Sequence, residues 1–131
     1  WLPVVKNNED YAGIRGQNIT GLAITTDTGY IKYRVHVDSG WLDFIDSRNT
    51  DINDYYNGYA GNDTSVDAVE IYYYTPDDII KSSGYHYAFY RVSPVNSNYY
   101  SYQKDNNKDN GMDGYAGICG HFIDRLQIDI R

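Results

Sequence analysis

The feature that most constrains this chain is a short phrase that occurs three times. It reads "DYAGIRGQNITGLAI" at residues 10–24, "GYAGNDTSVDAVEI" at 58–71 and "GYAGICGHFIDRLQI" at 114–128. In each copy a glycine follows Tyr-Ala, and an isoleucine falls at the same later place once a one-residue deletion after Asn62 is allowed. Glycine accepts positive φ, so we expect each copy to begin at a turn and continue into a strand.

The apolar residues of each phrase have the spacing of a strand with one buried face. The last two apolar positions are two residues apart in every copy, and one more apolar residue precedes them. These residues are Ile19, Leu22 and Ile24; Val66, Val69 and Ile71; and Ile123, Leu126 and Ile128. A period of two is typical of a half-buried strand.

The similarity extends upstream of the phrases. "YIKYRVHV" at 30–37 and "YAFYRVSPV" at 87–95 share Tyr-Arg-Val, and the first alternates apolar and polar residues as a strand does. An aromatic segment follows each, at 40–45 and 98–103, and the opening "WLPVV" matches the first of these. We therefore divide the chain into repeats at 1–28, 29–84 and 85–131. The first repeat lacks its leading strand, which favours a domain boundary just upstream of Trp1.

The pattern predicts one all-β domain spanning residues 1–131. Frequent turn residues separate about seven or eight short strands, as in an antiparallel β-sandwich with a threefold internal sequence repeat. A pseudo-threefold closed β structure is the alternative. Helical signals occur only at 76–84, where Pro76, Asp77 and Asp78 are suited to opening one helical turn and Gly84 to ending it.

Charge and hydropathy exclude several partners. The net charge is −7, from 18 acidic residues against 11 lysines and arginines, so nucleic acid and polyanionic wall polymers are disfavoured. No run of about 18 apolar residues is present, so we expect no membrane partner. A neutral glycan, or a peptide with free amines, suits this charge better.

Five segments together resemble a known family of wall-binding domains. They are "YRVHVDSGWL" (33–42), "NDYYNGYAG" (53–61), "VDAVEIYYYTPDDI" (66–79), "YRVSPVNSNYYSYQ" (90–103) and "DGYAGICGHFIDRLQI" (113–128). They span nearly the whole chain and resemble the target-recognition domain of zoocin A. Related domains occur in phage endolysins, amidases and bacteriocins. Tyr102 departs from the pattern, which has a tryptophan after "YYS".

The resemblance implies a non-catalytic module that targets bacterial cell-wall peptidoglycan or a wall-associated polymer, with no cofactor. It also implies a catalytic hydrolase domain in the same parent chain, acting outside the cell at the bacterial wall, as a phage endolysin does after lysis. The alternatives are a lectin-like adhesin domain that binds glycans, a structural spacer and, least favoured, a small hydrolase.

Tyrosine supplies the candidate ligand contacts, because 16 of the 131 residues are tyrosine. An aromatic face with a hydroxyl suits sugars, and acidic groups beside it suit an ammonium. Alternation after Ile71 buries Tyr73 and turns its two neighbours outward. The candidates are Trp41, Tyr55, Tyr56, Tyr72, Tyr74, Tyr99 and Tyr100, with Asp51, Asp54 and Asn57 as acceptors.

Catalytic and metal signals are weak, and we predict no catalytic residues. His36, His86 and His121 have no metal-ligand spacing, and Cys119 would act as a nucleophile only if the fold brought another histidine to it. Alternating oxygen ligands at Asp105, Asn107, Asp109 and Asp113 suggest calcium, but the glycine position and the missing glutamate depart from an EF-hand. A solvated turn is the favoured interpretation of that loop.

Overall fold

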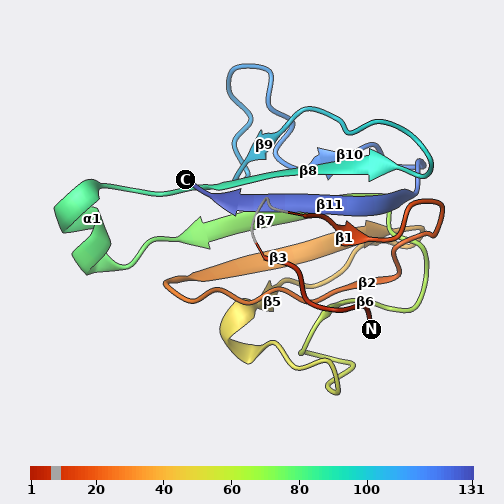
Figure 1. Cartoon of the computed structure of the whole chain (residues 1–131), viewed down its shortest axis with the longest axis horizontal. Coiled ribbons are helices and arrows are strands. Elements are labelled where there is room, and N and C mark those ends of the chain that lie inside the picture. The colour runs from red at the N-terminus through yellow and green to blue at the C-terminus, as the bar shows by residue number, and fades with distance from the viewer. Residues whose placement is uncertain (7–9) are drawn as a thin grey trace.

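Four long strands carry the fold. In the computed structural model, which describes residues 1–6 and 10–131, they are β3 (Tyr30–Val37), β7 (Ala68–Tyr74), β8 (Ala88–Pro94) and β11 (Ile123–Ile130). β3 pairs antiparallel with β7, and β8 pairs antiparallel with β11 (Figure 1). The two pairs belong to separate sheets that share one apolar core.

Seven two-residue strands complete the sheets. They are β1 (Ala12–Gly13), β2 (Gly21–Leu22), β4 (Gly40–Trp41), β5 (Ile45–Asp46), β6 (Ala60–Gly61), β9 (Gln103–Lys104) and β10 (Ala116–Gly117). Five of them extend the long pairs, and β2 and β6 pair with each other. The sheet orders are β1-β11-β8-β9, β10-β7-β3-β4 with β5 also on β3, and β2-β6. The predicted antiparallel sandwich is confirmed. The described residues form open sheets rather than the closed alternative, and the strand number was underestimated because two-residue strands leave no period in a sequence.

Strict alternation places the core on one face of β3. Ile31, Tyr33, Val35 and Val37 are buried, as the sequence predicts, while the intervening residues are partly exposed on the opposite face. Buried residues of β7, β8 and β11 complete the core with them. The outward-facing residues of β3 are therefore held on a rigid strand.

The Tyr-Ala-Gly segments are short strands, and the prediction that they form turns is wrong. Gly13, Gly61 and Gly117 do have positive φ, at 115°, 138° and 112°. A Cβ at these glycines would overlap a carbonyl oxygen of the partner segment, at Asp124, Thr20 and Asp67 respectively. Glycine is required at these three positions by a close approach between backbones.

The three phrases pair with one another according to one rule. Ala12 lies opposite Leu126, Ala60 opposite Leu22, and Ala116 opposite Val69, and these partners occupy the same position in the sequence alignment. Three further aligned residues form a ring of backbone hydrogen bonds. Ile19 donates to Ile123 at 2.9 Å, Val66 to Ile19 at 2.9 Å and Ile123 to Val66 at 3.0 Å.

The predicted repeat boundaries at 1–28, 29–84 and 85–131 stay a prediction, and residues 7–9 of the first range lie outside the described residues. What the structure adds is that all three phrases meet at one place. Each phrase there supplies hydrogen-bonding partners to another.

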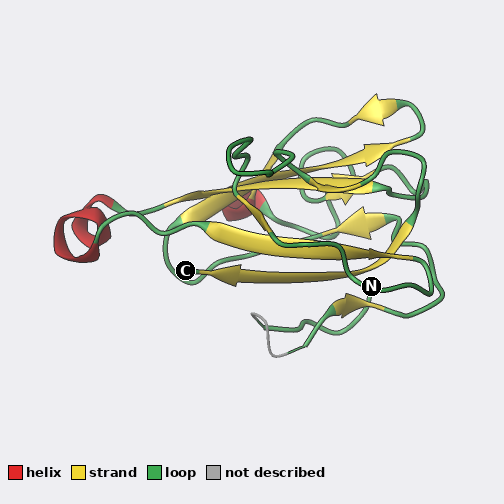
Figure 2. Ribbon diagram, turned by 90° about the horizontal axis from the view of Figure 1, so that it is seen from above, coloured by secondary structure: helices red, strands yellow, loops and turns green. Residues whose placement is uncertain are grey.

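The predicted helical turn is helix α1 (Asp77–Ser83). Pro76 is its N-cap, the two aspartates that follow lie in its first turn, and Gly84, with φ 88°, ends it. The helix projects from one end of the strands in both views (Figures 1 and 2). Among residues 1–6 and 10–131, no helix has the length and apolarity needed to cross a membrane.

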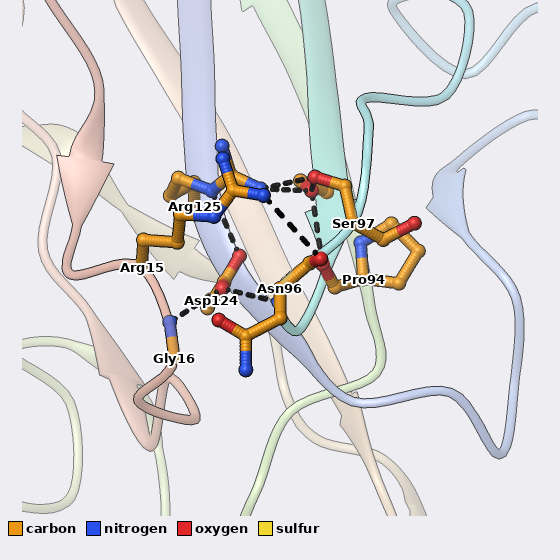
Figure 3. A network of polar contacts seen from close by, with 8 residues as sticks. Arg15, Gly16, Pro94, Asn96, Ser97, Asp124 and Arg125 are labelled. Atoms are coloured by element: carbon orange, nitrogen blue, oxygen red, sulfur yellow. Dashed lines mark hydrogen bonds and ion pairs between the residues drawn. The ribbon is translucent and has the colours of Figure 1, made fainter.

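A buried aspartate ties β11 to neighbouring segments (Figure 3). The Asp124 carboxylate accepts the backbone N–H groups of Gly16 and Asn96, each at 2.8 Å, and the Nε–H of Arg125 at 3.0 Å. Arg125 also donates to the Ser97 carbonyl. The network joins the segment after β1 and the loop after β8 to β11. Because β11 is the last strand, this links the beginning of the chain to its end.

Candidate functional site

The outer face of β3 and β7 gathers the polar and aromatic side chains that the core excludes. We use "outer face" for the outward residues of these two strands. On β3 these are Tyr30, Lys32, Arg34 and His36, and on β7 they are Glu70, Tyr72 and Tyr74. The register sets Tyr30 opposite Tyr74, Lys32 opposite Tyr72 and Arg34 opposite Glu70. Cross-strand neighbours on one face are close enough to interact directly.

An ion pair stands at the middle of the outer face. The Nε and Nη2 groups of Arg34 donate to Glu70 Oε1 at 3.1 and 2.8 Å, and the Glu70 side chain is only 12% exposed. The Arg34 guanidinium also lies 4.5 Å from the ring centroids of both Trp41 and Phe44. Because Glu70 and two aromatic rings hold it, the guanidinium has a defined orientation.

The two edges of the sheet bring a second aromatic residue to Trp41. β4 pairs with β3 at one edge and places Trp41 opposite His36, while β10 pairs with β7 at the other edge, directly after Tyr115. The Trp41 and Tyr115 rings lie 5.4 Å apart at 73°, so they meet edge to face across the strands.

These rings border a cleft of about 280 Å³, which we call the Trp41 cleft. Its lining residues are Arg34, Trp41, Glu70, Asn106, Lys108, Asp113, Gly114 and Tyr115. Burial raises the pKa of Tyr115, and the nearby Cys119 and Asp113 raise it further, so its hydroxyl stays protonated at neutral pH. The cleft thus combines two aromatic rings with charged groups of both signs.

A second hollow of about 600 Å³ lies beyond Phe44 and is more open and more polar. It is lined by Lys32, Phe44, Ile45, Asp46, Asn49, Asp51, Asp54 and Asn57, and we call it the acidic groove. Asp51 and Asp54 also order their own loop. Asp51 accepts the N–H of Asn53 at 2.9 Å, and Asp54 accepts the N–H of Tyr56 at 3.1 Å. The predicted acceptors Asp51, Asp54 and Asn57 therefore line the same open hollow.

Tyr72 and Tyr74 lie on the outer face, and Tyr73 between them is 6% exposed, as the alternation predicts. Tyr74 stacks on Tyr30 with ring centroids 4.5 Å apart and planes at 7°. The Arg48 guanidinium covers the Tyr30 ring at 3.6 Å. The pair Tyr72 and Tyr74 is thus part of a stacked aromatic surface at the end of the sheet away from Trp41.

Tyr55 and Tyr56 do not line either hollow, although in sequence they lie between two residues of the acidic groove, Asp54 and Asn57. They belong to a surface cluster in which Tyr55 lies 6.2 Å from Tyr59 and Tyr59 lies 4.8 Å from Trp1. Tyr56 is 84% exposed and Trp1 is 63% exposed. The Trp1–Tyr59 contact resembles the Trp41–Tyr115 contact, because in both a tryptophan meets edge to face the tyrosine of a Tyr-Ala-Gly phrase.

The structure does not bring Tyr99 or Tyr100 to either hollow. Tyr100 packs against the core, and the Tyr99 ring lies 4.4 Å from the guanidinium of Arg91 with its hydroxyl buried. Burial raises the pKa of Tyr99. Tyr102 also lies beside Arg91, with its ring centroid 4.7 Å from the guanidinium.

The loop that suggested calcium uses its first aspartate for a different purpose. Asp105 is 2% exposed, and its Oδ1 accepts the backbone N–H groups of Tyr73 at 3.1 Å and Ala88 at 2.9 Å. This carboxylate joins β7 to β8. In the part of the chain that the structure describes, Asp105, Asp109 and Asp113 do not form a cluster of possible metal ligands.

The sequence did not reveal a cluster of three other side chains at the end of the outer face. His36 Nδ1 lies 2.6 Å from Asp67 Oδ1, and the Cys119 sulfur lies within 4.8 Å of donor atoms of both residues. The three residues come from distant parts of the chain, so no local spacing identifies them. Arg34 and Glu70 were also missed as site residues. The strand alternation could have identified both, because it places them at outward-facing positions of β3 and β7.

Comparison of the chain with models of known protein families, with curated proteins and with solved structures gives no match. A functional assignment therefore depends on the geometry of the outer face and on the resemblance in sequence.

Proposed function

We propose that this domain is a non-catalytic module that binds bacterial cell-wall peptidoglycan or a wall-associated polymer through its outer face. The observation that carries the proposal is the Trp41 cleft, where Trp41 and Tyr115 meet at 73° beside the Arg34–Glu70 ion pair. The sequence resemblance to wall-targeting domains supports the same function. Trp41 is the central ligand contact in this proposal.

The cleft has the chemistry that a sugar requires. The apolar C–H face of a pyranose packs on an aromatic ring, and fixed polar groups bond its hydroxyls. Trp41 and Tyr115 provide the rings, while Glu70 and Lys108 provide an acceptor and a donor. The Arg34 guanidinium is already held by Glu70 and two aromatic rings, so its side chain loses less conformational entropy when a ligand binds.

The acidic groove extends this surface toward peptides. Asp46, Asp51 and Asp54 line it, with Lys32 as the one cationic residue of its described lining. Carboxylates attract the ammonium group of a stem or cross-bridge peptide. The proposed ligand therefore places a glycan in the Trp41 cleft and an amine-bearing peptide in the groove.

The module would hold a catalytic hydrolase domain of the same parent chain against its substrate. In this proposal it acts outside the cell at the bacterial wall, for example after a phage endolysin is released at lysis. The net charge of −7 makes nucleic acid an unsuitable partner.

Co-sedimentation with purified Gram-positive sacculi tests the proposal. Trp41→Ala should weaken binding about 30-fold, because loss of a central aromatic anchor costs about 2 kcal/mol. Trp1→Ala is the matched control, since Trp1 meets Tyr59 outside the cleft, and it should bind like wild type. Circular dichroism checks that both variants fold. Wild-type protein that stays in the supernatant, or equal losses in both variants, would contradict the proposal.

A lectin-like domain that binds free glycans is the second candidate. The observation that favours it is the second tryptophan–tyrosine contact, Trp1 with Tyr59 at 4.8 Å, because repeated aromatic sites are suited to multivalent glycan binding. Glycan-array binding that depends equally on Trp1 and Trp41, without binding to sacculi, would select this function.

A further inference from the structure

His36, Asp67 and Cys119 form a group at the end of the outer face that lies outside the lining of the Trp41 cleft, and we call it the Cys119 cluster. One donor atom from each residue lies within 4.8 Å of the other two. Asp67 is 3% exposed, His36 is partly exposed and Cys119 is exposed. The cluster therefore has a buried carboxylate at its base and a thiol open to solvent.

Backbone contacts hold the three residues together. The Asp67 N–H donates to the His36 carbonyl at 3.1 Å, which fixes the start of β7 against the end of β3. Cys119 lies in a turn closed by the His121 N–H on the Ile118 carbonyl at 2.9 Å. The next residue, Gly120, donates its N–H to Asp67 Oδ2 at 2.7 Å. Asp67 thus organises both the imidazole and the thiol-bearing turn.

The Asp124 network shows which part of this arrangement is needed for structure alone (Figure 3). In the alignment of the phrases Asp124 corresponds to Asp67, and it accepts the N–H of Gly16 just as Asp67 accepts that of Gly120. Arg125 neutralises Asp124 at 3.0 Å, whereas the residue aligned with Arg125 is Ala68.

The other two members of the cluster also differ from their aligned counterparts. His36 and Cys119 occupy the places of Ser93 and Arg15. A carboxylate bonded to a glycine N–H suffices to pin the turn, as Asp124 does. The imidazole and thiol are additions at the Asp67 position, where a guanidinium is absent.

Nitrogen, sulfur and oxygen donors of these types are those that zinc prefers. Zinc binds cysteine, histidine and aspartate at about 2.0–2.3 Å, commonly with three protein ligands and one open position. The thiol also favours zinc over calcium or magnesium. Ligand atoms around one tetrahedral zinc lie roughly 3.3–3.8 Å apart. The exposed Cys119 must therefore move inward, and the 2.6 Å hydrogen bond between His36 and Asp67 must open as the ion takes the place of its proton.

We propose that His36, Asp67 and Cys119 bind one zinc ion. Binding releases the thiol proton. The ion would compensate the buried Asp67 carboxylate, as Arg125 compensates Asp124. The cluster adjoins the Trp41 cleft, because the Trp41 ring lies 5.2 Å from the His36 ring. The fourth position of the ion would take water or a ligand oxygen.

Titration of the chelator-treated, reduced domain with zinc chloride by calorimetry tests the site. We expect one zinc per chain and a higher melting temperature. Even loss of an outer-shell partner costs about 10–100-fold in metal affinity, so Cys119→Ser and His36→Gln should each cost at least about tenfold. Cobalt should give a thiolate-to-metal charge-transfer band that Cys119→Ser removes. His121→Gln and His86→Gln are matched controls and should bind zinc like wild type.

Three results would overturn the proposal. The first is zinc affinity unchanged by Cys119→Ser, and the second is a cobalt spectrum without the thiolate band. The third is absence of zinc uptake, and His36-dependent alkylation of Cys119 in that case would make the cluster a nucleophile with its base. None of these measurements uses cell walls, so failure of the zinc site and failure of wall binding are separate outcomes.

Discussion

Two buried aspartates show how burial and the surrounding partners together set the pKa of a carboxylate. Burial raises the pKa of Asp105, and the N–H groups of Ala88 and Tyr73 offset this only in part. Burial also acts to raise the pKa of Asp124, but the N–H groups of Gly16 and Asn96 together with Arg125 lower it overall. Both carboxylates accept two backbone N–H groups, and their cations differ. Arg125 is hydrogen-bonded to Asp124, whereas the charge of Lys104 acts on Asp105.

These shifts give opposite contributions to stability. The pKa of Asp105 is above its ordinary 3.8, so its contribution is largest below that pH and declines as pH rises through the raised value. The pKa of Asp124 is below 3.8, so its contribution is complete above that pH and is lost as pH falls through the lowered value.

Asn substitutions should separate the two residues. Asp105→Asn keeps an oxygen for both N–H donors and removes a buried charge, so we expect equal or greater stability at pH 7 and a smaller pH dependence above pH 4. Asp124→Asn leaves Arg125 without its carboxylate and should cost about 3 kcal/mol. Urea unfolding at pH 7 and at pH 4 measures the free energy of unfolding of each variant. A comparable loss in both variants would contradict the assigned roles.

At the scale of elements, the fold depends on strands too short to be recognised alone. β1, β6 and β10 are two residues long, yet each pairs with another strand and places a positive-φ glycine against the backbone of that partner segment. The close contact requires hydrogen in place of a side chain. Conformation and packing are therefore separate demands on these glycines.

Two glycines with similar φ distinguish these demands. Gly117 has φ 112° with the Asp67 backbone in the way of a Cβ, and Gly40 has φ 117° with nothing within 4 Å. Gly40→Ala should cost about 1–3 kcal/mol from conformation alone. Gly117→Ala should cost about 1–3 kcal/mol more, from the overlap. Chemical denaturation of both variants measures the difference, and equal losses would show that the partner strand yields.

At the scale of the whole molecule, the long strands give alternation that the sequence displays directly. The 30–37 segment, the buried Tyr73 and the helix at 77–83 were all predictable, because each depends on side chains that are near in sequence. The short strands β1, β6 and β10 were not predictable, because pairing between distant segments creates them. The Ile19–Ile123–Val66 ring closes these pairings into one unit.

Such closure predicts cooperative unfolding, in which no phrase melts alone. Trp1 reports on the Tyr59 surface and Trp41 on the cleft, so Trp1→Phe and Trp41→Phe each leave one fluorescent probe. Their urea transitions should be single, and each should coincide with that variant's own circular dichroism. A fluorescence transition that precedes loss of secondary structure would indicate independent melting of that region.

The candidate site was predictable only in part. Trp41, Asp51 and Asp54 line hollows, and Tyr72 and Tyr74 lie on the outer face, but Tyr99 and Tyr100 are held by Arg91 and the core. An aromatic-rich sequence identifies the residue types that bind sugars. It does not tell which rings the protein uses for its own packing.

By itself, the sequence determined the strand faces, the helix, the glycines and the charge, because those follow from side-chain chemistry over a few neighbouring residues. The tertiary structure alone decided that Tyr115 reaches Trp41, and that Cys119 reaches His36 and Asp67. The physical reason is that these contacts depend on which distant strand each short strand pairs with. The pairing of β10 with β7 moves residues 115–120 across the sheet, and no local pattern encodes that choice of neighbour.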